Sequence, residues 1–267
     1  MKPLEMTYLG ERLLHTRPMV DAQTQTEPLA VDPDLLSTPW GLPCEAHAVA
    51  CCGLCYEMAQ EAAERSTAVV IHNLLSPTQM DTIVGDAQEL LPHLCQLAEQ
   101  CGGPCAGLLA LELEGSPHHT AFTEEHIMLN LHHDSFFQDN YETIHETILS
   151  GMAAYPSEWG VCTSALSVRC IELHTYAPGG GLVAPGHRDH GSVLSMSVLL
   201  TDTADVDGGD FITYVEGTPI IHKLRRGDAI LFLSEKIHNV STVVRGIRRS
   251  LVVEQWSGVA NQKDRFS

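Results

Sequence analysis

Basic residues are scarce in this sequence. Of its 267 residues only 15 are lysine or arginine, against 34 aspartates and glutamates, and the formal net charge at pH 7 is −19. A surface with this balance repels phosphate backbones and anionic lipid headgroups. We therefore expect no nucleic-acid partner and no anionic membrane partner, although Arg245, Arg248 and Arg249 form one local basic cluster.

Long apolar runs are missing as well. No stretch approaches the roughly 18 consecutive apolar residues of a membrane-spanning helix, and residues 1–20 lack the apolar core of a signal peptide. An intracellular, cytoplasmic protein is therefore expected. Nine cysteines, an odd number in a chain without a secretory signal, favour free thiols over a disulfide framework. With 44% hydrophobic and 18% charged residues, the chain can bury an ordinary globular core.

The N-terminal residues 1–65 predict an arm followed by one helix. Scattered prolines and the polar run 21–27 break any periodicity up to Pro43. Cys44–Arg65 contains no proline, and its alanine-rich sequence repeats apolar residues at helical spacing. We expect this second range to be helical.

Five cysteines form two groups that resemble the halves of a zinc site. They are Cys51, Cys52, Cys55, Cys101 and Cys105. Their spacing matches no zinc template well, and buried free cysteine is common in globular proteins. We expect these cysteines to hold no structural zinc.

The middle of the chain predicts a mixture of strands and helices. Ser76-Pro77 provides a cap and a first-turn proline for a helix that ends near Gln100. β-branched and apolar runs, together with one helical pattern, predict four further elements: strands at 67–72, 108–113 and 126–131, and a helix at 140–152.

From residue 167 onward the sequence consists of short apolar runs separated by glycine-containing turns. The runs are 168–173, 193–200, 211–215, 219–224, 229–233, 240–244 and 251–256. Strands at this spacing predict a sandwich or barrel, with a double-sheet jelly roll as the natural candidate. The expected fold is mainly β with supporting helices. We expect a main domain at 66–256, with its jelly-roll core at about 167–256, and a tail at 257–267.

His187 and Asp189 follow a glycine-rich turn, at the point where a strand is expected to begin. Residues i and i+2 of an extended chain face the same way, so the imidazole and the carboxylate can reach one ion. With one distal histidine, such a pair forms the facial triad of non-haem Fe(II) oxygenases, which leaves three octahedral positions open. The pattern His-x-Asp also occurs at His132 and Asp134, so spacing alone does not choose between the two pairs.

The residues downstream favour His187 and Asp189. His238 lies on a later expected strand, and Arg248 stands ten residues beyond it; no other histidine has an arginine at that offset. An anionic co-substrate that chelates iron at one end needs a cation at the other, and a guanidinium offers a bidentate clamp for a carboxylate. Ser250, on the same strand face, can add a hydroxyl donor.

Four ordered motifs resemble the 2-oxoglutarate/Fe(II) dioxygenase superfamily, most closely its prolyl-4-hydroxylase-like branch. They are His187-x-Asp189, Gly208-Gly209-Asp210-Phe211, Arg226-Gly227-Asp228-Ala229-Ile230-Leu231-Phe232, and the run from His238 through Val240, Val243, Gly246, Arg248 and Ser250 to Leu251. The resemblance is clear over about 167–256 and weaker back to Ser66. It implies a double-stranded β-helix, the cupin-like form of the jelly roll.

The resemblance also implies a site and a reaction. Fe(II) would be held by His187, Asp189 and His238, and 2-oxoglutarate by Arg248, with Tyr176 as a further partner of the co-substrate carboxylate. The implied reaction hydroxylates a substrate and releases succinate and carbon dioxide. Ascorbate is a candidate additional cofactor.

Comparison with branches of the superfamily leaves the substrate open. Collagen-type prolyl hydroxylases usually carry lysine where Arg248 stands, whereas oxygen-sensing prolyl hydroxylases and several small-molecule hydroxylases carry arginine. Gln255 and the net charge argue against the nucleic-acid dealkylase branch. Asp189 favours hydroxylation or desaturation, since related halogenases carry a small residue there.

The expected substrate is thus a peptide or a small molecule, and the oligomeric state is open. Two alternatives stand beside the prolyl-hydroxylase-like enzyme. One is a small-molecule tailoring hydroxylase or desaturase of the same superfamily. The other is a non-catalytic, cupin-like protein that binds or senses a metal.

Overall fold

The computed structural model describes residues 53–100, 125–132 and 135–261. The expected arm up to Pro43, four of the five grouped cysteines, the expected strand at 108–113 and Asp134 lie outside these ranges. The absence of zinc at the grouped cysteines therefore stays a prediction. Among the described residues, no helix combines the length and the apolar character needed to cross a bilayer.

The larger sheet has six strands in the order β1-β8-β4-β11-β3-β2, each antiparallel to its neighbours. Its long central strands β11 and β3 pair over most of their length. The strands are β1 (Val69–Ile71), β2 (His126–Asn130), β3 (Ser167–Tyr176), β4 (Leu194–Leu199), β8 (Ala229–Leu233) and β11 (Arg248–Trp256).

A smaller sheet faces the larger one. Its order is β7-β6-β9, and Leu182 adds an isolated bridge to Val240 of β9. A two-stranded ribbon pairs β5, which precedes β6 in the chain, with β10, which follows β9. The strands are β5 (Asp207–Gly208), β6 (Phe211–Val215), β7 (Thr218–His222), β9 (His238–Val240) and β10 (Val243–Arg245).

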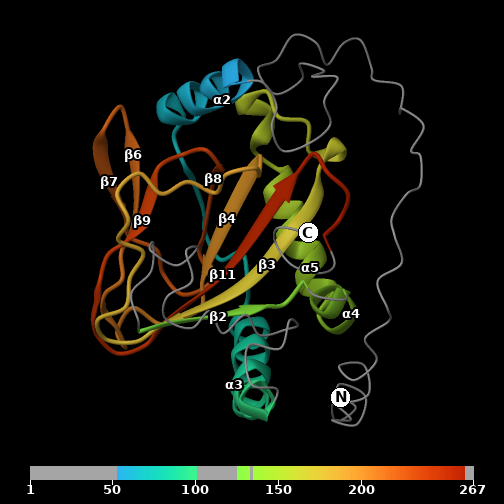
Figure 1. The fold of residues 1–267 in the computed structure, drawn as a ribbon, viewed down its shortest axis with the longest axis vertical. Coiled ribbons are helices and arrows are strands. Elements are labelled where there is room, and N and C mark those ends of the chain that lie inside the picture. The colour runs from blue at the N-terminus through green and yellow to red at the C-terminus, as the bar shows by residue number, and fades with distance from the viewer. Residues whose placement is uncertain (1–52, 101–124, 133–134, 262–267) are drawn as a thin grey trace.

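From β3 to β11 the chain alternates between the two sheets. It passes from β3 to the Leu182 bridge, then to β4, to β6 and β7, to β8, to β9 and finally to β11. Figure 1 shows the β6, β7 and β9 strands on one side and the larger sheet opposite them. This alternation is that of a double-stranded β-helix, so the predicted fold class is confirmed.

Helices α3 (Pro77–Gln100), α4 (Phe136–Asn140) and α5 (Glu142–Ala153) lie on the outer face of the larger sheet (Figure 1), with short 3-10 turns at Pro156–Trp159 and Thr163–Ala165. Helix α2 (Gly53–Arg65) lies across one end of the sheets, where it contacts β6 (Figure 1). The buried hydrophobic residues form two clusters, one on each face of the larger sheet, and the alternating side chains of β8 contribute to both. Leu231 packs in the cluster that includes Ile148 of α5, whereas Ile230 and Phe232 face the space between the sheets.

Local sequence signals set several element boundaries. Helix α3 begins at Pro77 as predicted, and Ser76 caps it: the Gln79 backbone N–H donates to Ser76 Oγ at 3.3 Å, and Gln79 Oε1 accepts from the Ser76 backbone N–H at 2.9 Å. This reciprocal pair is a capping box. The helix predicted at 140–152 is α5, which the short helix α4 precedes.

Candidate active site

His187 and Asp189 lie in the segment that leads from the Leu182 bridge to β4. The prediction that this pair starts a strand is wrong, because β4 begins only at Leu194. Backbone hydrogen bonds hold the segment instead. The Asp189 N–H donates to the Ser234 carbonyl at 2.9 Å, and the His238 N–H donates to the His187 carbonyl at 3.1 Å. The segment therefore runs beside the chain that connects β8 to β9.

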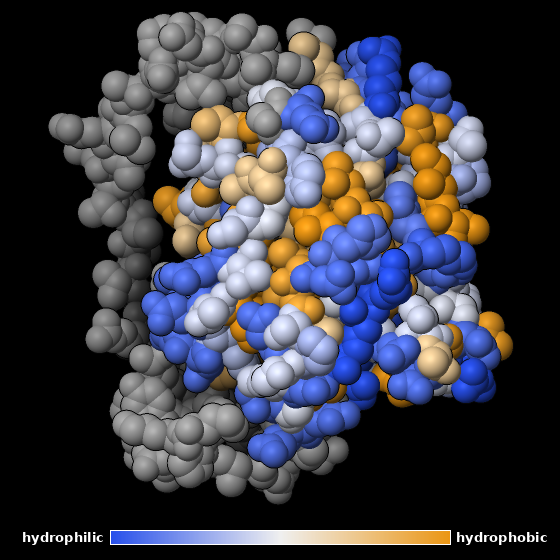
Figure 2. Space-filling view, turned by 180° about the vertical axis from the view of Figure 1, so that it is seen from behind, coloured by the Kyte–Doolittle hydropathy of each residue, from blue (hydrophilic) through white to orange (hydrophobic). Residues whose placement is uncertain are grey.

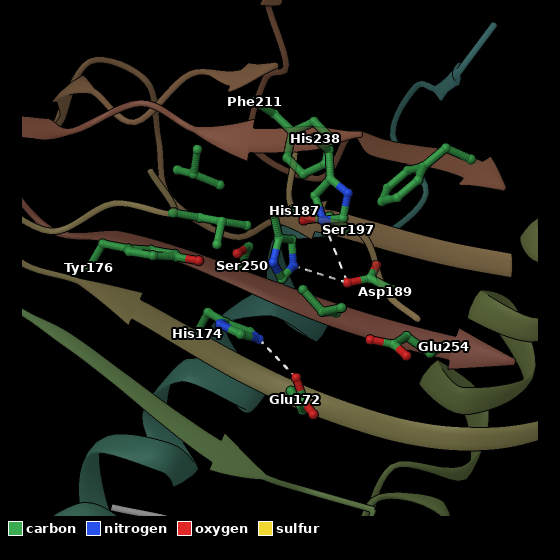
Figure 3. A pocket seen from close by; sticks show the side chains of 14 residues that line it. Glu172, His174, Tyr176, His187, Asp189, Ser197, Phe211, His238, Ser250 and Glu254 are labelled. Carbon is green, nitrogen blue, oxygen red and sulfur yellow. Dashed lines mark hydrogen bonds and ion pairs between the residues drawn. The ribbon is translucent and has the colours of Figure 1, made fainter. Parts of the chain in front are cut away.

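These contacts bring the three predicted metal ligands together. Asp189 Oδ1 lies 3.4 Å from His187 Nε2 and 3.6 Å from His238 Nε2, and one donor atom of each residue lies within 4.8 Å of the others. Adjacent ligands about 2.0–2.2 Å from one ion are separated by roughly 3 Å, so only a small contraction is needed. Figure 3 shows the two imidazoles and the carboxylate converging on one point.

Hydrogen bonds around the triad fix its side chains. Ser195 Oγ donates to Asp189 Oδ2 at 2.6 Å, which leaves Oδ1 directed at the two imidazoles. Nδ1 of His238 lies 3.0 Å from the Lys236 carbonyl oxygen, at hydrogen-bond distance. A carbonyl accepts only from an N–H, so Nδ1 carries the proton and Nε2 presents a lone pair, as a metal-binding imidazole requires.

Helix α2 braces both segments that carry the triad. Lys236, fully buried, donates from Nζ to the Ala63 carbonyl at 2.7 Å, and Arg188 Nη2 lies 2.8 Å from Glu64 Oε1. Burial, then the charge of Arg188, lowers the pKa of Lys236 to about 8. Lys236 and Arg188, which are close to the triad in the sequence, thus contact helix α2, which is far from them in the sequence.

Arg248 lies at the other end of the site, on the inner side of β11. It is 1% exposed; its Nε donates to the Gly209 carbonyl at 2.7 Å and its Nη1 to Ser250 Oγ at 2.8 Å. Tyr176 is its cross-strand partner on β3, and the guanidinium lies 5.5 Å from the tyrosine ring centre. Arg249 points to the opposite face and is half-buried, as predicted from strand alternation.

Burial shifts the pKa values of Arg248 and Tyr176. It lowers the pKa of Arg248, an effect that the neighbouring Tyr176 and Asp210 oppose, and it raises the pKa of Tyr176. The Tyr176 hydroxyl therefore stays protonated and can donate a hydrogen bond to an anion. Gly209, with φ of 69°, makes room for the arginine, because a Cβ there would lie 2.6 Å from Arg248 Cδ.

A single cavity between the sheets joins the two ends. The triad lines it together with Tyr176 and Ser250, and Phe211 and Phe232 form an aromatic wall against His238. Of the other His-x-Asp pair, the structure describes only the histidine. His132 is buried, with its Nδ1 accepting from the Ile171 backbone N–H at 3.1 Å, and Asp134 lies outside the described residues.

Several cavity residues were not assigned to this site by the sequence analysis, among them Glu172, His174 and Glu254. A signal for them exists in the alternation of the strands. Glu172 and His174 precede Tyr176 at two-residue steps on β3, and Glu254 follows Ser250 at two such steps on β11. Alternate residues of β3 and β11 therefore lie on the same sheet face as Tyr176 and Ser250.

The comparisons with known proteins agree with the resemblance that the sequence motifs indicated. No protein-family model matches the chain. Over 144 residues it is 30% identical to a PKHD-type hydroxylase of Synechococcus sp. (strain CC9311), which covers 49% of this chain and 63% of that protein. Over 57 residues it is 46% identical to a PKHD-type hydroxylase of Hyphomonas neptunium, covering 21% and 24%. The chain is similar to PKHD-type hydroxylases.

The similarity is partial, since the chain spans less than two thirds of the length of these curated relatives. Among solved structures, AviO1 from Streptomyces viridochromogenes matches with a TM-score of 0.49 and 15% identity, over 78% of this chain and 97% of that one. A prolyl hydroxylase from Trichoplax adhaerens matches with a TM-score of 0.48 and 13% identity, over 75% and 88%. The resemblance that the sequence motifs indicated is confirmed by the PKHD-type relatives.

Proposed function

We propose that the chain is an Fe(II)- and 2-oxoglutarate-dependent dioxygenase that hydroxylates its substrate and releases succinate and carbon dioxide. One observation carries this proposal. One cavity is lined by three converging donors, from His187, Asp189 and His238, and the buried guanidinium of Arg248 lies directly behind its far wall, in contact with Ser250 and Tyr176. The catalytic unit would comprise residues 66–256.

The donor set fits Fe(II). Two imidazole nitrogens and one carboxylate oxygen on one side of an ion match the ligands that non-haem Fe(II) uses, and they leave the cavity side open. His238 already has the protonation that a ligand needs, since its Nδ1 proton is held by the Lys236 carbonyl. Asp189, anchored through its other oxygen by Ser195, can offer Oδ1 without moving.

The chain's own residues would position the reactants. Arg248, with Ser250 and Tyr176, would bind the distal carboxylate of 2-oxoglutarate, and the aromatic wall of Phe211 and Phe232 would exclude water. Fe(II), when bound, supplies the activation of dioxygen that couples oxidative decarboxylation of 2-oxoglutarate to substrate hydroxylation. The residues keep the two co-reactants apart from bulk solvent and next to each other.

The decisive assay is succinate formation by the reconstituted protein. Protein loaded with Fe(II) and supplied with 2-oxoglutarate and dioxygen, with and without ascorbate, should release succinate at a rate that a true substrate increases. A panel of proline-containing peptides and small metabolites, followed by a mass gain of one oxygen atom, separates the peptide hydroxylase from the tailoring hydroxylase. Loss of two hydrogens indicates a desaturase. A protein that binds Fe(II) and forms no succinate with any of these would be the cupin-like metal binder.

A further inference from the structure

Two buried carboxylates line the cavity in addition to Asp189. Glu172 lies on β3 and Glu254 on β11, and each residue is at most 1% exposed. Figure 3 shows both on the sheet wall beside the triad. Among the described residues that line this cavity there is no lysine and no arginine.

Glu254 lies close to the candidate metal ligands. It is the cross-strand partner of Ser195, the residue that holds Asp189. Ser192 also links the two acids, because its hydroxyl donates to Glu254 Oε2 at 2.6 Å and its backbone N–H to the Asp189 carbonyl at 3.2 Å. A group bound by Glu254 would therefore lie beside the metal centre.

Groups of opposite charge lie near the two ends of the cavity: Glu172 and Glu254 in its wall, and Arg248 behind Ser250, to which it donates. Strand β11 turns the same face inward at Arg248, Ser250 and Glu254, and the six steps along the strand from Arg248 to Glu254 span about 20 Å. The Arg248 end suits the anionic co-substrate. The Glu254 end suits a cation, because a carboxylate in a site of low dielectric attracts one strongly.

Neighbouring side chains hold the two glutamates in place. Arg169 lies behind Glu254, with its Nη1 3.7 Å from Oε2, and the same nitrogen donates to the His190 carbonyl and to Ser192 Oγ. His174 Nε2 lies 3.1 Å from Glu172 Oε2, and its Nδ1 lies 2.9 Å from His126 Nε2. These contacts fix both carboxylates in the wall of the cavity.

Placing two carboxylates inside a barrel is costly for folding. A buried charge loses its hydration, and packed apolar side chains at such positions often give a more stable protein. The apolar alternative is present in the same wall, since Val252 lies between Ser250 and Glu254 in the inward series. Charges beside a reaction centre are more useful for binding a ligand than for stabilising the fold.

We propose that Glu172 and Glu254 bind an organic cation, a protonated amine or guanidinium, on the substrate, and that this contact presents a neighbouring C–H bond to the metal centre. The inference rests on the proposed function and deepens it by naming the substrate class. The co-substrate and the substrate would occupy opposite ends of one cavity, with groups of opposite charge at the two ends, which prevents each from taking the other's place.

Matched pairs of ligands test the charge requirement. The probes are L-arginine against uncharged L-citrulline and L-lysine against L-norleucine, each free and as the central residue of a capped tripeptide. Added to the anaerobic Fe(II) and 2-oxoglutarate complex, at least one cationic member should bind at least tenfold more tightly than its neutral partner, which corresponds to about 1.4 kcal/mol. With dioxygen present, the same member should stimulate succinate formation.

Amide variants identify the residues responsible. Glu254→Gln and Glu172→Gln remove the charge and keep the shape, so each should reduce the preference for the cationic probe at least threefold and leave 2-oxoglutarate affinity unchanged. The matched control is Asp207→Asn, since Asp207 lies on the exposed ribbon and pairs with Arg245 there. Thermal unfolding of each variant separates a lost contact from a lost fold.

The outcomes distinguish the two proposals. Protein that binds neither Fe(II) nor 2-oxoglutarate refutes the proposed function. Protein that binds both but prefers neutral probes, or keeps its preference in both glutamine variants, refutes only the cation site. A second equivalent of metal that is lost in these variants would also overturn it, because Cys170, Glu172 and Glu254 would then hold an ion, as their donors within 4.8 Å of one another allow.

Discussion

Replacing Arg248 by alanine tests the co-substrate clamp directly. Two of its donors are already committed inside the protein, Nε to the Gly209 carbonyl and one Nη1 hydrogen to Ser250 Oγ. The second Nη1 hydrogen and the Nη2 group remain for a carboxylate, which permits two parallel charge-assisted bonds. Each such bond contributes about 1.5–3 kcal/mol. Their loss amounts to about 3–6 kcal/mol, or roughly a hundredfold to ten-thousandfold in affinity.

The half-saturating concentration of 2-oxoglutarate is the quantity to measure, by succinate release and by equilibrium binding to the Fe(II) protein. Arg248→Ala should raise it at least tenfold even if water replaces part of the lost contact. Fe(II) affinity should stay within twofold, because the arginine is not a ligand. Arg248→Lys should recover part of the loss, since lysine keeps the charge but not the two-pronged geometry.

Arg249→Ala serves as the matched control, because its side chain points to the other face of β11. It should change the half-saturating concentration less than twofold. Equal effects at Arg248 and Arg249 would mean that the register of β11 is wrong. No effect at Arg248, in a variant with normal thermal unfolding, would refute the clamp and favour the cupin-like metal binder.

Four further predictions follow from single contacts. Asp189→Ala should abolish stoichiometric Fe(II) binding in equilibrium dialysis; retention of iron and turnover would refute the triad. Gly209→Ala should lower the free energy of unfolding in urea by about 1–2 kcal/mol, because its φ is 69°, and should weaken 2-oxoglutarate binding by displacing Arg248. Ser76→Ala should cost about 1 kcal/mol in the same urea assay through loss of the helix cap, with unchanged succinate formation. Burial alone would raise the pKa of Asp228, but hydrogen bonds from the backbone N–H groups of Arg225 and Asn73 outweigh burial and lower that pKa. The ionised carboxylate therefore stabilises the fold above a pH of about 4, and this stabilisation disappears as the pH falls further. The difference in unfolding free energy between wild type and Asp228→Asn should shrink on acidification.

Local signals in the sequence predicted most of the order of elements, although the single strand expected at 240–244 is divided between the end of β9 and the start of β10. Short apolar runs between glycine-containing turns predicted β3, β4, β6, β7, β8 and β11, because strand formation and turn chemistry depend on residues close together in the chain. The ten-residue spacing between His238 and Arg248 was informative for the same reason. The chain between them is short, so the start of β9 and the start of β11 must lie close together.

Predictions about orientation were less successful. His187 and Asp189 were expected at the start of a strand, and they lie in a segment whose direction is set by hydrogen bonds to Ser234 and His238. Such bonds join residues about fifty positions apart, and no local pattern encodes them. The hydrogen bond from Lys236 to the Ala63 carbonyl of helix α2 joins residues 173 positions apart, so it is still further from any local pattern.

The acidic wall shows most clearly what the sequence determines and what it leaves to the tertiary structure. The alternation of polar and apolar residues in β3 specifies that Glu172 and His174 share one face, since successive side chains of a strand point to opposite sides. A polar face of this kind is usually the solvated one. Here the smaller sheet covers it, so both faces of β3 are buried and the polar face becomes the wall of a cavity. Only the packing of two sheets decides which face meets water, because that depends on partners far along the chain.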